Sequence, residues 1–464
     1  MPEKLNWLTY TLPQTLTFVV ALVVIAHILR SRRSPPAAMA WVLVIALLPH
    51  LGVPLYIMFG GRKVRHMAQR KPRLAKSPMP LTHEGHHGPP FVSHAADGVF
   101  AATPENRTVI LADGEQAFAE TLRLIRGAEE TLYLSTFILG QDETGRAIVQ
   151  GLAEKAAQGV KVRMLLDALG CMKVRKSFLA PITGAGGRVA FFMPMMHLPF
   201  RGRANLRNHR KMLIADGARA MVGGMNLAEN YMGTHGPGQR WRDLAVYLEG
   251  PSVAHIHQVF ASDWRFTHGE DIPPVEHKFP EGPNNRKATL QVIGSGPDVP
   301  GDPLRDAILS FLFKANSRAW IVTPYFVPDE LVATALSIAA RRGVDVRLIL
   351  PRRSNHPLTD LARAGYLTPL QEDGVRVFLY QPGMLHAKAM ILDDFVAITG
   401  SANVDMRSLL LNYEVGLCIY SRHVIRELEG WMRWLQTDCL ERKIHHSMPW
   451  ELLQGAARLF APLL

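Results

Sequence analysis

The chain has 464 residues, a formal net charge of +12 and a pI near 9.7. Hydrophobic residues make up 48% of it, which excludes a disordered chain and is enough for two folded domains and an anchor. The excess of Lys and Arg favours anionic partners, either nucleic acid or the headgroups of a membrane. The three cysteines, Cys171, Cys418 and Cys439, are widely spaced and odd in number, which argues against a disulfide framework.

Two uncharged hydrophobic stretches open the chain, over 12–29 and 37–59. Each is long enough to cross a bilayer as a helix. The first has no small-residue cleavage pattern after it, which argues against a signal peptide. The second contains Pro49, Gly52 and Pro54, so it either spans the membrane with a kink or re-enters it. Residues 1–61 are therefore predicted to form a membrane anchor, a transmembrane helical hairpin.

Basic residues lie between the two stretches and, in a longer cluster, after the second. The two clusters give a mixed signal by the positive-inside rule, and the longer one leads us to place the catalytic part in the cytoplasm. Residues 62–105 are rich in basic residues, Pro, Gly and His and have no hydrophobic period, which predicts a solvated linker. We interpret its histidines as solvated and expect no metal site there.

From about residue 106, helical and extended patterns alternate in two similar series. The segment 343–350 closely resembles 159–166, and the repeat period is near 180 residues. This predicts two pseudo-symmetric α/β lobes, mixed sheets flanked by helices, over 106–280 and 281–464. The second lobe ends in an amphipathic segment, 450–464, that packs on the core or contacts the membrane surface. Helices are expected over 114–128, 145–158, 251–266, 303–315 and 330–342, and strands over 132–139, 160–166, 188–193, 218–222, 244–248, 319–323, 343–350 and 375–380.

One short motif, H-x-K-x-x-x-x-D, occurs once in each lobe, over 209–216 and 386–393. Each copy is followed by a turn of small residues and an Asn, and in both copies that Asn lies seventeen residues after the His. Chance does not readily produce two complete copies with this offset. The duplication indicates two half-sites that meet in one centre for phosphate chemistry.

On a strand, residues two apart point to the same face, so His209 and Lys211 share a pocket, as do His386 and Lys388. One neutral imidazole can attack phosphorus, and the other, protonated, can give its proton to the leaving alcohol. The lysines stabilise charge in the transition state, so no metal or other cofactor is required.

The other polar residues of the motifs are given supporting roles. Asn226, Asn403 and Ser401 are candidates for binding the substrate phosphate, and Gly replaces Ser401 in the first copy. Each half also offers one carboxylate that can orient an imidazole, Asp243 and Glu414. Asp216 and Asp393 complete the catalytic motifs, but their position at a strand end favours a turn-forming role. Arg207 and Arg210, beside the first motif, either steer phosphate or lie solvated.

Longer strings around the motifs resemble the phospholipase D superfamily and, within it, the bacterial cardiolipin synthases. These strings are RNHRKMLIADG, GGMNLAENY, WRDLAVYLEGP, TPYFVPDE, LHAKAMILDD and GSANVDMRSLLLNYEV. The resemblance extends over nearly the whole chain. It implies transphosphatidylation, in which two phosphatidylglycerols give cardiolipin and glycerol through a phosphohistidine, with His209 favoured as the nucleophile.

The resemblance also implies a multi-pass protein of the bacterial inner membrane whose partner is anionic phospholipid, with no nucleic acid expected. Hydrolysis by a membrane-bound phospholipase D is one alternative, because no motif reports whether water is excluded from the site. A non-catalytic scaffold that binds anionic lipid is another, disfavoured by two intact motifs. Phosphatidylethanolamine as a second donor, the acyl preference and the oligomeric state stay open.

Overall fold

The computed structural model describes residues 2–30, 35–59, 71, 98–194, 206–234, 240–275, 287–441, 454–455 and 457. They fall into two compact units, one holding the N-terminal helices and one holding a large sheet. The three N-terminal helices are α1 (Pro2–Arg30), α2 (Pro35–Leu47) and α3 (Pro49–Phe59).

The second hydrophobic stretch is interrupted at Leu48, because Pro49 disfavours helical backbone in the residue before it and begins α3. Ile28, Ile45 and Tyr56 are buried in a small apolar cluster within this unit. No helix in the described part of the chain is long and apolar enough to cross a membrane. The transmembrane hairpin expected over residues 1–61 stays a prediction.

The second unit is built on one continuous sheet of fifteen strands. Strands of the first half are β1 (Thr103–Leu111), β2 (Thr131–Thr136), β3 (Lys161–Asp167), β4 (Arg188–Phe192), β5 (Met212–Ala215), β6 (Arg219–Gly223) and β7 (Ala245–Glu249). Those of the second half are β8 (Lys287–Ser295), β9 (Arg318–Val322), β11 (Asp345–Pro351), β12 (Arg376–Tyr380), β13 (Ala389–Leu392), β14 (Val396–Gly400), β16 (Glu414–Ile419) and β17 (Cys439–Glu441). Two short strands, β10 (Phe326–Val327) and β15 (Val404–Asp405), pair separately.

The strand order confirms the internal duplication. The first half runs β4-β3-β2-β5-β6-β7-β1, and the second runs β12-β11-β9-β13-β14-β16-β8 with β17 added at its edge. The two series join where β1 pairs antiparallel with β8. In each half three strands are parallel and the others antiparallel, so both sheets are mixed, as predicted.

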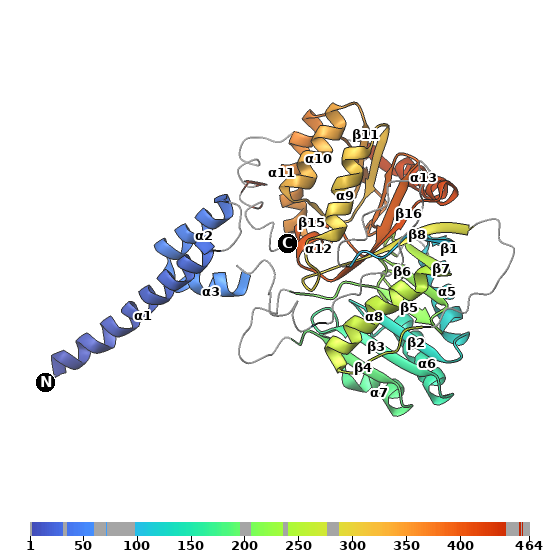
Figure 1. The fold of residues 1–464 in the computed structure, drawn as a ribbon, viewed down its shortest axis with the longest axis horizontal. Coiled ribbons are helices and arrows are strands. Elements are labelled where there is room, and N and C mark those ends of the chain that lie inside the picture. The colour runs from blue at the N-terminus through green and yellow to red at the C-terminus, as the bar shows by residue number, and fades with distance from the viewer. Residues whose placement is uncertain are drawn as a thin grey trace. The chain divides into compact units, whose positions relative to one another are not determined.

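Helices cover both faces of the sheet in each half. The two halves appear in Figure 1 as neighbouring groups of elements. In the first half α5 (Gly114–Arg126), α6 (Glu143–Ala157) and α7 (Lys176–Gly184) lie on one face and α8 (Ser252–His268) on the other. In the second half the corresponding helices are α9 (Pro303–Lys314), α10 (Glu330–Arg341) and α11 (Pro357–Glu372), with α13 (Arg422–Thr437) opposite. A short helix, α12 (Met406–Leu410), follows β15.

The start of the first lobe needs correction. The sheet begins before residue 106, since Val99 already bridges to Ile293 and β1 starts at Thr103. Its first residues are polar and lie at a bulge, so they lack the alternation that marks a strand. In the C-terminal segment only 454–455 and 457 are described, and Ala457 packs in an apolar cluster with Val327 and Ala362. Of the two alternatives expected for this segment, packing on the core is therefore observed at Ala457.

Candidate active site

Each His-x-Lys segment lies just before a strand rather than within it, because β5 and β13 each begin one residue after the lysine. The expectation that His209 and His386 occupy strands is therefore wrong. The backbone of each histidine pairs instead with the other half of the molecule. His209 N donates to Tyr413 O at 2.9 Å, and His386 N donates to Arg242 O at 2.7 Å. These contacts bring the two motifs into one site.

The orienting carboxylates are exchanged between the halves. His209 Nδ1 lies 3.0 Å from Oε1 of Glu414, which begins β16 in the second half. The same nitrogen is 3.1 Å from the backbone oxygen of Ser401. His386 Nδ1 lies 2.6 Å from Oδ2 of Asp243, which precedes β7 in the first half. Each imidazole is thus held by a carboxylate that follows the other motif, a pairing that the sequence alone did not indicate.

Burial sets the charge state of both imidazoles. It lowers the pKa of His209, with the carboxylate of Glu414 opposing this effect and the ammonium of Lys211 adding to it. Burial and the neighbouring Lys388 lower the pKa of His386 to about 3, against the opposing effect of Asp243. Both rings are neutral at pH 7 in the empty site. With Nδ1–H held by a carboxylate, Nε2 is the nitrogen left for chemistry.

The two lysines are fully buried beside their own histidines. Lys211 Nζ donates to the backbone oxygen of His209 at 2.6 Å. Lys388 Nζ donates to the backbone oxygen of His386 and lies 3.2 Å from Nε2 of its ring. Burial lowers the pKa of Lys211 well below its usual range and that of Lys388 to about 8, although nearby carboxylates oppose the change.

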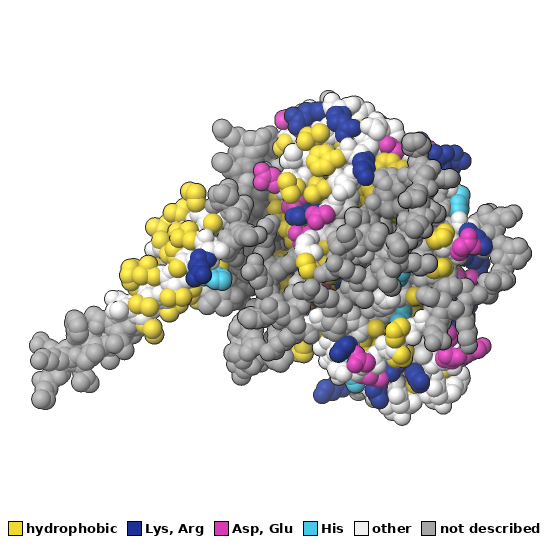
Figure 2. All heavy atoms as spheres, viewed as in Figure 1, with side chains coloured by type: hydrophobic (Ala, Val, Ile, Leu, Met, Phe, Trp, Pro, Cys, Tyr) yellow, Lys and Arg dark blue, Asp and Glu magenta, His cyan; other side chains and the backbone are white. Residues whose placement is uncertain are grey.

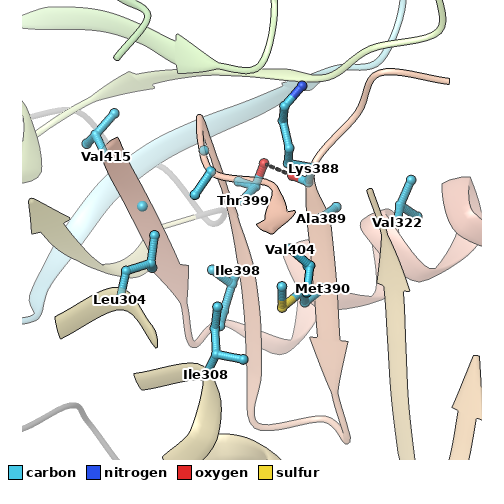
Figure 3. Close-up of a pocket in the computed structure, with 13 residues that line it drawn as sticks. Leu304, Ile308, Val322, Lys388, Ala389, Met390, Ile398, Thr399, Val404 and Val415 are labelled. Atoms are coloured by element: carbon cyan, nitrogen blue, oxygen red, sulfur yellow. Dashed lines mark hydrogen bonds between the residues drawn. The ribbon is translucent and has the colours of Figure 1, made fainter. Parts of the chain in front are cut away.

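A small apolar cavity lies beside the stem of each lysine, and the two occupy equivalent positions in the two halves. In the second half it is lined mainly by aliphatic side chains such as Leu304, Ile308 and Ile398. Figure 3 shows the ammonium end of Lys388 directed away from this lining. Apolar walls around the stems explain why the lysines are poorly solvated and their ammonium forms disfavoured.

The motif aspartates lie in the turns after β5 and β13, and both have positive φ. The carboxylate of Asp216 accepts from the backbone N–H groups of residues 129–131. Asp393 accepts from those of residues 316–318 in the equivalent position. Each aspartate therefore ties its hairpin to the entry of a neighbouring strand, β2 or β9, in the turn position expected from the sequence.

The two asparagines are buried, and the side chain of each forms a hydrogen bond within the protein. Asn226 Oδ1 accepts from the N–H of Ile138 at 3.1 Å. Asn403 Nδ2 donates to Asp405 Oδ2 at 3.0 Å, and the Oδ1 of Asn403 has no partner among the described residues. Sequence reasoning did not single out Asp405, whose carboxyl pKa is raised by burial to about 6. Its position two residues after the Asn was the available signal.

The small-residue turns differ between the halves for a steric reason. Ser401 donates its hydroxyl to Glu414 Oε2, so it holds the carboxylate that orients the first imidazole. At the equivalent Gly224, a Cβ atom would lie 2.4 Å from Oδ1 of Asp243 and 3.0 Å from the side chain of Lys388. No side chain fits there, so the serine of the second half has no counterpart in the first.

Aromatic rings surround the imidazoles unequally. Phe137 lies edge-on to His209 with ring centroids 5.1 Å apart. Three aromatic side chains face His386 at 5.0 to 6.1 Å, and two of them carry a phenol hydroxyl. They are Tyr231, Trp241 and Tyr325. The string TPYFVPDE contained the last of these, but its place beside His386 followed only from the fold.

The arginines beside the first motif are neither solvated nor available for steering. Arg210 is fully buried and donates to Asp263 at 2.6 Å. Arg207 is also buried, 3.7 Å from Asp167. Both expectations for these residues are therefore wrong, because each guanidinium is enclosed with a carboxylate. Arg407 is half-buried, and burial lowers its pKa.

The chain is similar in sequence to known proteins over most of its length. The family model described as the phospholipase D-like domain of cardiolipin synthase matches residues 121–264 and 308–436. A model described as the phospholipase D-nuclease N-terminal domain matches residues 19–61. The chain is 32% identical to the major cardiolipin synthase of Bacillus subtilis over 469 residues, covering 96% of this chain and 97% of that protein. It is 31% identical to cardiolipin synthase 1 of Bacillus cereus over 459 residues, covering 93% and 90%.

A solved structure shares the fold. The crystal structure of phosphatidylserine synthase from Haemophilus influenzae covers 77% of this chain and 95% of its own, with a TM-score of 0.59 and 15% sequence identity. At this identity the likeness concerns the fold alone.

Gly224→Ser is expected to lower kcat by roughly 100-fold or more, the scale of general acid catalysis, because the new Cβ displaces Asp243 from His386. The reciprocal variant Ser401→Gly removes a hydroxyl that donates to Glu414 and accepts from the backbone N–H of Val415, and it should cost about tenfold, the scale of one hydrogen bond to a charged group. Steady-state kinetics on a phosphodiester substrate measures both. Equal losses in the two variants would contradict this steric account.

Asp393→Asn is expected to destabilise the fold by about 1–3 kcal/mol, because the amide cannot accept all the N–H groups that the carboxylate accepts. Thermal unfolding measures the loss, and kcat should stay close to that of the unchanged protein. Asp394→Asn is the matched control, since its half-exposed carboxylate only forms an ion pair with Arg318. A loss of kcat without a loss of stability would show that Asp393 acts in the chemistry.

Proposed function

The chain belongs to the family of phospholipase D-like cardiolipin synthases, and from this premise we propose that it joins two phosphatidylglycerols through a phosphohistidine. The products are one cardiolipin and one glycerol, and the enzyme is a phosphatidyltransferase. The observation that carries the proposal is the crossed pair of contacts, in which His209 is held by Glu414 and His386 by Asp243.

In the first step, His209 Nε2 attacks phosphorus of one phosphatidylglycerol. The bond from phosphorus to the glycerol oxygen breaks, and glycerol leaves with a proton from His386. Two features support this assignment of roles. The contact of Glu414 with Nδ1 of His209 leaves Nε2 available, whereas the ammonium of Lys388 lies 2.7 Å from Nδ1 and 3.2 Å from Nε2 of His386 and so faces both ring nitrogens. A nucleophile needs an available lone pair, so His209 is the better candidate.

In the second step, His386 takes the proton from the hydroxyl of a second phosphatidylglycerol, and that oxygen attacks the phosphohistidine. The bond between phosphorus and His209 breaks, which releases cardiolipin and restores the neutral imidazole. Glu414 supports both steps, because its carboxylate stabilises the positive charge that His209 carries while it is bonded to phosphorus. Asp243 does the same for the imidazolium of His386.

The bound phosphodiester explains how His386 acts as an acid despite a pKa near 3 in the empty site. A negative charge beside a buried imidazole favours its protonated form. The same anion favours the ammonium forms of Lys211 and Lys388, and we propose that these lysines hold the phosphoryl oxygens. Asn226 and Asn403 then hold the walls of the phosphate site, and Ser401 acts through Glu414.

We further propose that residues 1–61 form the multi-pass anchor of a bacterial inner-membrane protein, with the catalytic unit in the cytoplasm. The described parts of α1, α2 and α3 expose many large apolar side chains, including Leu29 at 71% and Leu47 at 75% (Figure 2). Such surfaces are costly in water and suit a lipid environment. The match of residues 19–61 to the family's N-terminal model also supports this anchor.

The test is to follow products from phosphatidylglycerol in detergent micelles, with lipids measured by mass spectrometry and glycerol measured enzymatically. Cardiolipin and glycerol should appear together and be absent with His209→Ala and with His386→Ala. Parallel micelles with phosphatidylethanolamine examine the second donor. Phosphatidic acid without cardiolipin would identify a hydrolase instead, and no turnover with either lipid would favour a binding scaffold.

The intermediate is tested by denaturing the enzyme during turnover at alkaline pH, where phosphohistidine persists, and mapping the modified peptide. The phosphatidyl group is expected on His209, because its Nε2 is the available lone pair. His386→Ala should allow little or no labelling from phosphatidylglycerol, since the leaving glycerol needs a proton. A label on His386 in the unchanged enzyme would reverse the two roles.

The pH dependence of kcat/KM reports the free enzyme, in which the pKa of Lys388 is about 8. Its ammonium is present below this pKa and lost above it, so kcat/KM should fall as pH rises through about 8. Lys388→Arg keeps a positive charge at every accessible pH and should remove this alkaline limb, although it changes the geometry and lowers the rate. An unchanged limb in Lys388→Arg would assign it to another group.

A further inference from the structure

Lys71 belongs to the segment predicted to be a solvated linker, yet its side chain is fully buried. Its Nζ contacts Asp263 and lies 2.7 Å from Oδ2 of Asp298. It also lies 4.6 Å from the centre of the Tyr413 ring. A buried ammonium is unfavourable unless it is paired and hydrogen-bonded, and here two carboxylates receive it. The linker prediction is therefore wrong at this residue.

The ion cluster around Lys71 reaches the first motif directly. Asp263 Oδ1 accepts from Arg210 Nη1 at 2.6 Å, and Asp263 Oδ2 accepts from Asn208 Nδ2 at 3.2 Å. Asn208 and Arg210 are the residues on either side of His209. The carboxylate of Asp263 thus fixes both neighbours of the imidazole, and Lys71 contacts that carboxylate.

Arg210 carries the connection on to the carboxylate that orients the ring. Its Nε donates to the backbone oxygen of Glu414 at 3.0 Å, and its Nη2 donates to that of Ser295 at 3.0 Å. Tyr413, which Lys71 contacts, accepts from the backbone N–H of His209. The same guanidinium therefore helps to position the strand end from which the Glu414 side chain reaches Nδ1.

The cluster is balanced in charge, with the cations Lys71 and Arg210 facing the anions Asp263 and Asp298. Loss of one cation would leave an uncompensated negative charge in a buried region, where its effect is strong. The second half lacks this arrangement, because the position equivalent to Arg210 is the buried Ala387. The dependence is thus specific to the half-site of His209.

We propose that Lys71 is a positioning residue for phosphatidyl transfer, holding Asp263 and Arg210 so that His209 and Glu414 keep their reactive geometry. Lys71 thereby contributes to the first half-site from outside the sheet and its helices. The proposal rests on the proposed function only in requiring a measurable attack on a phosphodiester by this centre. The loss of kcat is expected whichever imidazole is the nucleophile, whereas the direction of the pH shift given below follows from His209 as the nucleophile.

The test compares Lys71→Met with Lys71→Arg in the full chain, using phosphatidylglycerol micelles. Lys71→Met should lower kcat at least about tenfold with little change in KM, since the Lys71 side chain is fully buried and has no exposed surface with which to bind lipid. Lys71→Arg keeps the positive charge and should recover part of the loss. Lys161→Met, which removes an exposed lysine, is the control and should behave as the unchanged enzyme.

The pH profile separates positioning from simple stabilisation. His209 is faced by the charged groups Glu414, Lys211 and Lys388. After Lys71→Met the cluster gains a net negative charge, which favours the protonated imidazole, so the acidic limb of kcat/KM should move to higher pH. Adding Asp298→Asn restores neutrality and should return the limb toward its original place even if part of the rate stays lost.

A parallel assay with bis(4-nitrophenyl) phosphate needs no lipid acceptor. If the unchanged enzyme cleaves it but makes no cardiolipin, the proposed function fails while the effect of Lys71 is still measured. If Lys71→Met lowers the thermal stability but leaves kcat and the pH profile unchanged, the residue is only structural and the positioning proposal is overturned. If Lys71→Met does not fold, kcat and the pH profile are measured instead in two other variants. These are the double variant Lys71→Met with Asp298→Asn and the single variant Lys71→Arg, and the same outcomes support or overturn the proposal.

Discussion

The arrangement on which the site depends is the exchange of carboxylates between the two halves. His209 is held by Glu414, and His386 is held by Asp243, so neither half contains a complete orienting pair. The backbone contacts of the two histidines cross in the same way. Each half-site is therefore built only when the halves are joined through β1 and β8. Pairing of β1 with β8 therefore joins the halves that supply each imidazole and its carboxylate.

The duplication is symmetric in topology and asymmetric in chemistry. Gly224 leaves space for Asp243 and Lys388, whereas Ser401 adds a hydroxyl to Glu414. The first half encloses an ion cluster beneath its motif, and aromatic rings gather around the imidazole of the second. Two equivalent imidazoles would share both roles. Unequal surroundings are what the proposed mechanism requires, since it assigns one imidazole the role of nucleophile and the other that of acid and base.

The sequence predicted the features that depend on local patterns. Amphipathic periods located the helices from 114 and 303 close to their observed starts, and the Asp-Gly pair at 216 located a hairpin turn. The two strings with His and Lys identified the candidate site, because their residue types are rare in such a spacing. What failed was the assignment of these residues to strands, since their partners lie across the junction and no local pattern reports a distant partner.

The same reason explains the other misses. Lys71 stands among basic residues and prolines, and nothing near it in sequence indicates that Asp263 and Asp298 enclose it. For the same reason, the sequence around Arg210 does not distinguish it from an arginine at the protein surface. The exchange of Asp243 and Glu414 between the halves could not be predicted either, because no local sequence pattern indicates which histidine each carboxylate contacts. Residues whose roles depend on long-range charge pairing require the fold.

Charge balance connects the buried groups to the chemistry. With neutral imidazoles, the ammonium groups of Lys211 and Lys388 offset the carboxylates of Asp243 and Glu414, and the depressed pKa values show that burial permits little excess of positive charge. A phosphodiester adds one negative charge to this enclosed space. The most favourable response is uptake of one proton, and His386, paired with Asp243, is the group that the proposed mechanism requires in protonated form. In the proposed mechanism, substrate binding thus favours the protonated His386 that departure of the alcohol requires.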